Sequence, residues 1–181
     1  MNTTTPSNSY LVITALGQDH TYILANLTNT LTLLGGNILN SKMTSLGSEL
    51  GIMLLIEGSW GAIAKIEANL PSIEQKLDIV INVRRTTPQQ SKKKTMPYLL
   101  HSVAIDREGI LNDLTQFLLA QNIHIHDING YTYMTNTGVR MADTTINMHV
   151  AATAHLPTLR EKLMIYCDEL NLDASLEPIR D

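Results

Sequence analysis

Two short runs of residues have the chemistry to bind a small zwitterion. They extend from Gly17 to His20 and from Asp106 to Ile110, and each joins a strand-like apolar stretch to a helical pattern. Unpaired backbone N–H groups at a helix start and the helix dipole bind carboxylates. The ammonium group would need acceptors, which the next strand can supply. The candidate ligand-binding residues are Gly17, Gln18, Asp19, His20, Asn37, Ile38 and Asn40, and in the second half Asp106, Arg107, Glu108, Gly109, Ile110, Asn122, Ile123 and Asp127.

The acidic residue of each run also suits a purely structural role. Asp19 and Asp106 stand where a helix N-cap is expected, and a capping carboxylate stabilises a helix by about 1 kcal/mol without any ligand. We expect both to cap their helices, with ligand contact as an additional role. Tyr22 occupies the position that Gly109 has in the second run. Because a glycine lets a ligand approach the backbone and a tyrosine fills that space, residue chemistry favours the second run.

Other reactive side chains give weaker signals. His124, His126 and Asp127 are residue types that bind divalent metals, but no third distant ligand is evident, so we expect a surface histidine pair and no metal. The single cysteine, Cys167, excludes an intramolecular disulfide and is expected to be buried as a small apolar group. The sequence lacks the common hydrolase, metalloprotease and phosphate-loop motifs. We therefore predict no enzymatic activity and no cofactor.

Composition argues against two further classes of protein. The formal net charge is −4 and aromatic residues make up 4% of the chain, which disfavours direct DNA contact and base stacking. The basic cluster from Lys92 to Lys94 lies in a polar stretch that we interpret as a solvated linker. The first nine residues do not resemble a signal peptide, and no apolar run reaches the roughly 20 residues of a membrane span. We expect a cytoplasmic protein without membrane contact.

The elements that would position the candidate residues occur twice. Each half follows the order strand, helix, strand, strand, helix, strand, and the opening strands are residues 10–16 and 98–105. Asp19 and Asp106 are 87 residues apart, whereas Asn37 and Asn122, each followed by isoleucine, are 85 residues apart. We take these two asparagines as counterparts, which predicts a slightly longer first helix or helix exit in the first half.

This order predicts an α+β protein of two tandem ferredoxin-like βαββαβ domains, each an antiparallel sheet with both helices on one face. The expected bounds are 10–86 and 97–181, with a proline-bracketed linker at 87–96. The helix that begins near Trp60 is expected to end at Pro71. We interpret the first and third strands of both halves as apolar on both faces. The open sheet faces should then be covered by the sister domain or by a second chain.

A βαββαβ repeat with this turn resembles the ACT domain, a fold that senses small molecules in amino-acid metabolism, often at domain interfaces. The second run resembles the family's Asp-Arg-Pro-Gly-Ile turn, with Glu108 in place of proline. The first half departs further, with His20, Thr21 and Tyr22 in place of Arg, Pro and Gly. The likeness sharpens towards the tandem-ACT repressors of the glycine cleavage system in the runs 10–17, 52–63, 69–71 and 85–87.

The resemblance implies a glycine-responsive co-repressor that lacks its own DNA-binding module. Its implied partners are a small amino acid, glycine, and a DNA-bound LysR-type transcriptional regulator; the covered sheet faces are compatible with a homodimer. Two alternatives stay open. One is an ACT-type sensor of another small amino acid that regulates a metabolic enzyme. The other is a catalytic, acylphosphatase-like domain in which Arg107 would bind phosphate, although fold alone does not define function.

Overall fold

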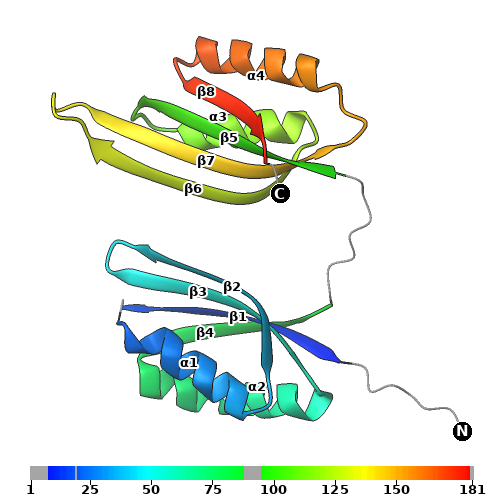
Figure 1. Cartoon of the computed structure of the whole chain (residues 1–181). Helices are drawn as coiled ribbons and strands as arrows, with labels where there is room; N and C mark the ends of the chain where they lie inside the picture. The colour runs from blue at the N-terminus through cyan, green and yellow to red at the C-terminus, as the bar shows by residue number, and fades with distance from the viewer. Residues whose placement is uncertain (1–7, 19, 88–94, 180–181) are drawn as a thin grey trace, which may run out of the picture. The chain divides into compact units, whose positions relative to one another are not determined.

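The computed structural model of the chain describes residues 8–18, 20–87 and 95–179. The chain divides into two units, Met1–Gln90 and Ser91–Asp181 (Figure 1). Most of the expected linker, residues 88–94, lies outside the described residues. The last strand of the first unit ends at Thr86 and the first strand of the second begins at Thr95. The domain bounds 10–86 and 97–181 therefore stay a prediction at their inner ends.

The first unit is a four-stranded antiparallel sheet with two helices on one face (Figure 1). Its strands lie in the order β2-β3-β1-β4. The elements are β1 (Ser9–Gln18), α1 (Tyr22–Leu33), β2 (Asn37–Leu46), β3 (Glu49–Gly58), α2 (Trp60–Leu77) and β4 (Ile79–Thr86). Alternate residues of β1 and β3, such as Leu11, Ile13, Leu54 and Ile56, are buried against the helices. This alternation is what a sheet covered on one face requires.

The second unit repeats this topology in the order β6-β7-β5-β8. Its elements are β5 (Thr95–Ile105), α3 (Ile110–Ala120), β6 (His124–Met134), β7 (Arg140–Ala151), α4 (Leu156–Glu169) and β8 (Asp173–Pro178). The core is again aliphatic, with Leu100, Leu114, Leu118 and Leu163 almost fully buried. The predicted fold class, two tandem ferredoxin-like βαββαβ domains, is confirmed.

Helix α2 continues through Pro71 to Leu77, so the predicted end at Pro71 is wrong. Ile73 and Leu77 extend the buried stripe beyond the proline. Burial of these side chains outweighs the hydrogen bond that a proline removes from a helix. The helix ends at Asp78, which adopts a left-handed conformation with φ of 53°.

The pairing of Asn37 with Asn122 as counterparts is also wrong. The N–H of Gly36 donates to Leu31 and that of Ile123 donates to Leu118, so both helices end in the same turn. The left-handed residue of that turn is Gly35 (φ 90°) in the first unit and Asn122 (φ 54°) in the second. Gly35 and Asn122 are thus equivalent, and the 87-residue spacing continues unbroken through both helices. Glycine and asparagine are the two residues that tolerate this conformation best.

The two open sheet faces differ from each other. The first carries exposed apolar side chains, among them Leu16, Met53 and Val80, as predicted for that half. In the second unit, the open face of β7 bears polar residues, including Asp143 and Thr145. The prediction of two apolar faces is therefore wrong for β7. A hydrogen bond of 3.1 Å joins His101 Nε2 to Asp143 Oδ1 on this face, which also carries the exposed side chains of Ile105, Tyr131 and Tyr133.

Cys167 lies in the second core on α4, as expected, with 1% of its surface exposed. Burial in this apolar environment, with Asp168 beside it, raises the pKa of the thiol to about 11. The group is therefore protonated at neutral pH. Among the helices described here, none has both the length and the apolar character to span a bilayer.

Candidate functional site

The turn between β5 and α3 is tied to the start of β7. The N–H of Asp106 donates to the Arg140 carbonyl at 2.9 Å, and the Asp106 carboxylate pairs with Arg140 Nε at 2.5 Å. The N-cap of α3 is Gly109, whose φ is 89°, and no side chain caps the helix. The expectation that Asp106 caps α3 is therefore wrong. Its carboxylate instead fixes the turn to the neighbouring strand.

Arg107 folds back onto the helix that follows it. Its Nη2 donates to Asp113 Oδ2 at 2.9 Å, and its Nη1 donates to the Glu108 carbonyl at 3.1 Å. Tyr166 on α4 donates its hydroxyl to the Asp113 carbonyl at 3.2 Å, which links the two helices at this end. The ion pair with Asp113 is partly exposed, so a ligand carboxylate can compete for the guanidinium. Of the predicted residues, Asp106, Arg107, Glu108, Gly109 and Ile110 thus lie together.

The equivalent turn in the first unit has different chemistry. Asp19 lies outside the described residues. The N-cap of α1 is Thr21, again without a side-chain cap, and the rings of His20 and Tyr22 stack with centroids 5.5 Å apart. A Cβ on Gly17 would lie 2.7 Å from Ile79 Cγ2, so this glycine is needed where β1 meets β4. Helix α1 thus begins with the bulky Tyr22 at the position where the second unit has Gly109.

The candidate residues on the following strands lie far from these turns within each unit. Across the sheet, Asn40 on β2 aligns with Leu55 on β3 and with Val12 on β1. Val12 is five residues, or about 16 Å, before Gly17 along β1. Asp127 aligns through Asn147 with Leu99, six residues or about 20 Å from Ile105. The expectation that the turn and the next strand meet around one ligand is therefore not met inside a single unit.

Several of these strand residues already have local roles. Glu57 accepts hydrogen bonds from Asn8, Tyr10 and Asn37, which hold the pKa of its carboxyl below its usual range. Ile38 packs against the first core and Ile123 is part of the second. Asn122 supplies a left-handed helix end. Sequence spacing identified these residues as a group, but the structure places them at the opposite end of each sheet from the turns.

The histidines on β6 lie beside a further histidine. The His126 ring meets the His149 ring edge-on, with centroids 5.4 Å apart, and His124 lies opposite His149 in the sheet. His149 Nδ1 is 3.2 Å from the Thr95 hydroxyl. A search of the described residues finds no group of three or more His, Cys, Asp or Glu placed to hold a metal ion.

Arg140 and Asp113 are the functional-site residues that sequence reasoning missed. Arg140 is 34 residues from its partner Asp106 in sequence, and only the register of the β6–β7 hairpin on β5 brings the two together. Asp113 stands in the first turn of α3, where an acidic residue is favoured by the helix dipole. That placement was a usable signal for Asp113. No linear pattern points to Arg140.

Comparison with known proteins agrees with this architecture. Residues 9–84 match the ACT domain. The chain is 28% identical to the glycine cleavage system transcriptional repressors of Escherichia coli (strain K12) and Shigella flexneri, over 97% of this chain and 93% of each relative. A solved structure provisionally assigned as such a repressor superposes with a TM-score of 0.73 at 25% identity, covering 96% of this chain and 99% of that one. A Galdieria sulphuraria protein of unknown function has the same fold, with a TM-score of 0.77 at 20% identity, covering 96% of this chain and 100% of that one.

Proposed function

We propose that this chain, in which residues 9–84 match the ACT domain and the second domain has the same strand order, is a glycine-responsive co-repressor of the glycine cleavage system. Similarity along 97% of the chain to repressors of that system supports a regulatory role rather than a catalytic one. In this proposal the protein contacts a DNA-bound LysR-type regulator, and glycine changes the affinity of that contact. A tenfold change requires only about 1.4 kcal/mol of differential binding.

The observation that carries the glycine site is the uncapped entry of α3. Gly109 adopts a left-handed conformation with no side chain, and no other side chain caps the helix. Arg107 stands beside this entry in a partly exposed ion pair. A glycine carboxylate can therefore accept hydrogen bonds from backbone N–H groups at the helix start. It can also replace the Asp113 carboxylate as the partner of the Arg107 guanidinium. In the first unit, stacked His20 and Tyr22 stand at this place, which makes the second unit the better site.

A homodimer would bring the separated halves of the candidate site together. The turn at Gly109 and the strand residues at Asn40 and Asp127 lie at opposite ends of their sheets. Both groups can contact one ligand only if they come from different copies of the fold. Exposed Leu16, Met53 and Val80 on the open face of the first sheet support association with a second chain. We include this dimer in the proposal.

Action through a protein partner accords with the charge of the chain. The formal net charge of −4 opposes approach to DNA phosphates, whereas it does not oppose contact with a basic protein surface. The acylphosphatase-like alternative is disfavoured because the relatives that match 97% of the chain are transcriptional repressors. The sensor of another amino acid differs from the proposal only in ligand and partner.

Calorimetric titration of the full chain with glycine, alanine, serine and leucine tests the ligand. We expect saturable binding of glycine, weakened about tenfold in Arg107→Ala because a charged hydrogen-bond donor is lost. Lys65→Ala, which removes an exposed cation on α2 of the first unit, is the matched control and should bind as the wild type does. Binding of another amino acid in place of glycine would favour the alternative sensor, and binding of none would refute both.

The partner is tested with the purified LysR-type regulator on its operon DNA. The chain should retard the regulator–DNA complex further and leave free DNA unshifted, and glycine should reverse the extra shift in proportion to its occupancy. A direct shift of DNA by the chain alone would contradict the indirect mechanism. Light scattering of the same sample reports whether the chain is a dimer.

A further inference from the structure

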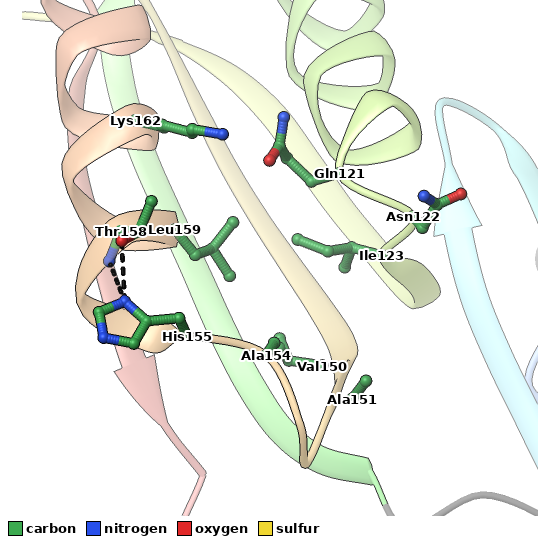
Figure 2. A pocket seen from close by; sticks show the side chains of 10 residues that line it. All are labelled: Gln121, Asn122, Ile123, Val150, Ala151, Ala154, His155, Thr158, Leu159 and Lys162. Atoms are coloured by element: carbon green, nitrogen blue, oxygen red, sulfur yellow. Dashed lines mark hydrogen bonds between the residues drawn. The ribbon is translucent and has the colours of Figure 1, made fainter.

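The second unit contains a pocket at the end of its sheet opposite the β5–α3 turn. The pocket has a volume of about 300 Å³ and lies where α3 ends and α4 begins (Figure 2). Helix α3 has 11 residues, so the pocket is about 16 Å from Gly109 along the helix. It is lined by Gln121, Asn122, Ile123, Val150, Ala151, Ala154, His155, Thr158, Leu159 and Lys162. It is therefore separate from the turn at Gly109, although it includes Asn122 and Ile123 from the predicted ligand-binding residues.

The first unit fills the equivalent space. There, one residue separates β3 from α2, and a Cβ added to Gly36 would lie 2.8 Å from Ile56 and 2.9 Å from Ile66. A Cβ on Gly58 would lie 3.3 Å from Ala62 in the first turn of α2. The helix thus packs directly onto glycines. Side-chain volume at these positions would force the helix away.

The second unit has that side-chain volume. The strand register and the helix ends make Ile123 the counterpart of Gly36, and Val150 the counterpart of Gly58. Four residues, 152–155, separate β7 from α4, so the helix starts later and its first turn does not close over the sheet. The pocket is the space that results. It is a consequence of large residues at two positions where the first unit has glycine.

The lining has an apolar side and a charged rim. Figure 2 shows Leu159 and Ile123 facing each other across the pocket, with Val150 and Ala154 beside them. Lys162 on α4 and Gln121 at the end of α3 extend towards each other at one end (Figure 2). None of the ten lining residues is acidic. The N–H of Thr158 donates to His155 Nδ1 at 3.4 Å, and Lys162 contributes an ammonium group to the lining.

We propose that this pocket binds a small organic monocarboxylate with an apolar tail. The carboxylate would pair with the Lys162 ammonium and accept from the Gln121 amide, and the tail would lie against Ile123, Val150 and Leu159. A volume of 300 Å³ is at the lower end for small-molecule sites and fits a compact ligand. Apolar walls with a few polar groups at one end are the usual lining of such sites.

Heteronuclear NMR of the full chain titrated with straight-chain carboxylates from acetate to hexanoate tests the proposal. Shifts should concentrate on amides of the lining residues, including Ala154 and Thr158. Affinity should rise about fourfold with each added methylene until the pocket is full. Lys162→Gln should weaken hexanoate binding about tenfold. Ala154→Leu, which adds bulk to the lining, should abolish binding.

Lys65→Gln is the matched control, because Lys65 is an exposed lysine on α2 of the first unit. It should leave hexanoate binding unchanged. Equal binding by wild type and Lys162→Gln, equal binding of hexanol, or shifts scattered over surface lysines would overturn the proposal. Glycine titration of Lys162→Gln separates this site from the proposed one, since glycine binding at the β5–α3 turn should persist whether or not the carboxylate site exists.

Discussion

The two domains have the same strand order but differ in how closely the second helix meets the sheet. In the first, Gly36 and Gly58 let α2 rest directly on β3, and in the second Ile123 and Val150 hold α4 away. Both solutions bury an aliphatic core of similar composition. The comparison shows that one topology can be closed or hollow at the same place, depending on a few side-chain volumes.

The turns before the first helix of each domain also differ, in the side chains that stand at the helix start. In the first domain, the stacked rings of His20 and Tyr22 stand at the helix entry, whereas in the second Gly109 leaves the entry open. Ion pairs from Asp106 to Arg140 and from Arg107 to Asp113 surround that opening. In the second domain α3 thus starts without a side-chain cap and ends at a pocket. We infer that it is specialised for ligands and that the first is specialised for packing.

The largest expected effect comes from making the first domain resemble the second. Gly36→Val adds a Cβ that would lie 2.8 Å from Ile56 Cγ2. Overpacking of this kind lowers the free energy of unfolding by about 2–3 kcal/mol. Urea unfolding followed by hydrogen exchange should show the loss in the first domain. Gly61→Ala is the control, since a Cβ there meets nothing within 4 Å and should not destabilise the domain. Equal stability of Gly36→Val and wild type would mean that α2 can withdraw as α4 does.

A smaller effect on stability is expected at Asn122, the counterpart of Gly35. Substitutions there should separate its role in ending the helix from a role in binding glycine. Its φ of 54° predicts that Asn122→Ala costs about 1 kcal/mol, because alanine is strained in that conformation. Asn122→Gly should keep or slightly raise the free energy of unfolding. Chemical denaturation of the two variants measures the difference. If Asn122→Gly keeps its stability but loses glycine binding, the side chain serves the ligand and not only the helix end.

The smallest effect concerns charge at equivalent positions on the second helices. In the first domain Glu67 accepts two hydrogen bonds from Arg85, at 2.6 and 2.9 Å, which lowers the pKa of its carboxyl. In the second, Arg160 occupies the same position and donates to the Leu176 carbonyl at 3.0 Å. Because the pKa of Glu67 is lower in the folded state, the carboxylate stabilises the fold at pH values above its ordinary pKa of 4.5. This stabilisation is lost as the pH falls through the pKa of the folded state.

The wild type should therefore lose more stability than Glu67→Gln on acidification below about pH 4.5. The difference should be about 0.5 kcal/mol, because the pair is partly exposed and screened by solvent. Thermal unfolding of both proteins between pH 7 and pH 3 measures it, and added salt should reduce it. Parallel stability curves at every pH would show that the Arg85 contact contributes nothing measurable.

Periodicity in the sequence was sufficient to predict both domains, because strands and helices with one buried face leave a regular apolar pattern. It failed where tertiary contacts override local rules. Pro71 was expected to end α2, but burial of Ile73 and Leu77 extends that helix beyond the proline. Asp106 was expected to cap α3, but its carboxylate pairs with Arg140 instead.

The candidate site was predicted less completely than the fold. The turn from Asp106 to Ile110 was found from its residue types, since the whole group is contiguous in sequence. The strand residues were assigned by assuming that sequence neighbours approach the turn, but β2 and β6 begin at the far end of each sheet. The carboxylate pocket left no motif, because it arises from volume at Ile123 and Val150 that is apparent only beside the first domain.

One irregularity shared by both sheets bears on how the protein avoids uncontrolled aggregation. The pairing of β2 with β3 skips Leu39, and that of β6 with β7 skips His126, so each of these outermost strands carries a β-bulge. A strand of another molecule that paired with β2 or β6 would find the backbone hydrogen-bonding groups irregularly spaced near the start of the strand. Fibril-like addition of strands at the edge strands β2 and β6 is therefore disfavoured, even though both have unpaired backbone N–H and C=O groups along their outer side.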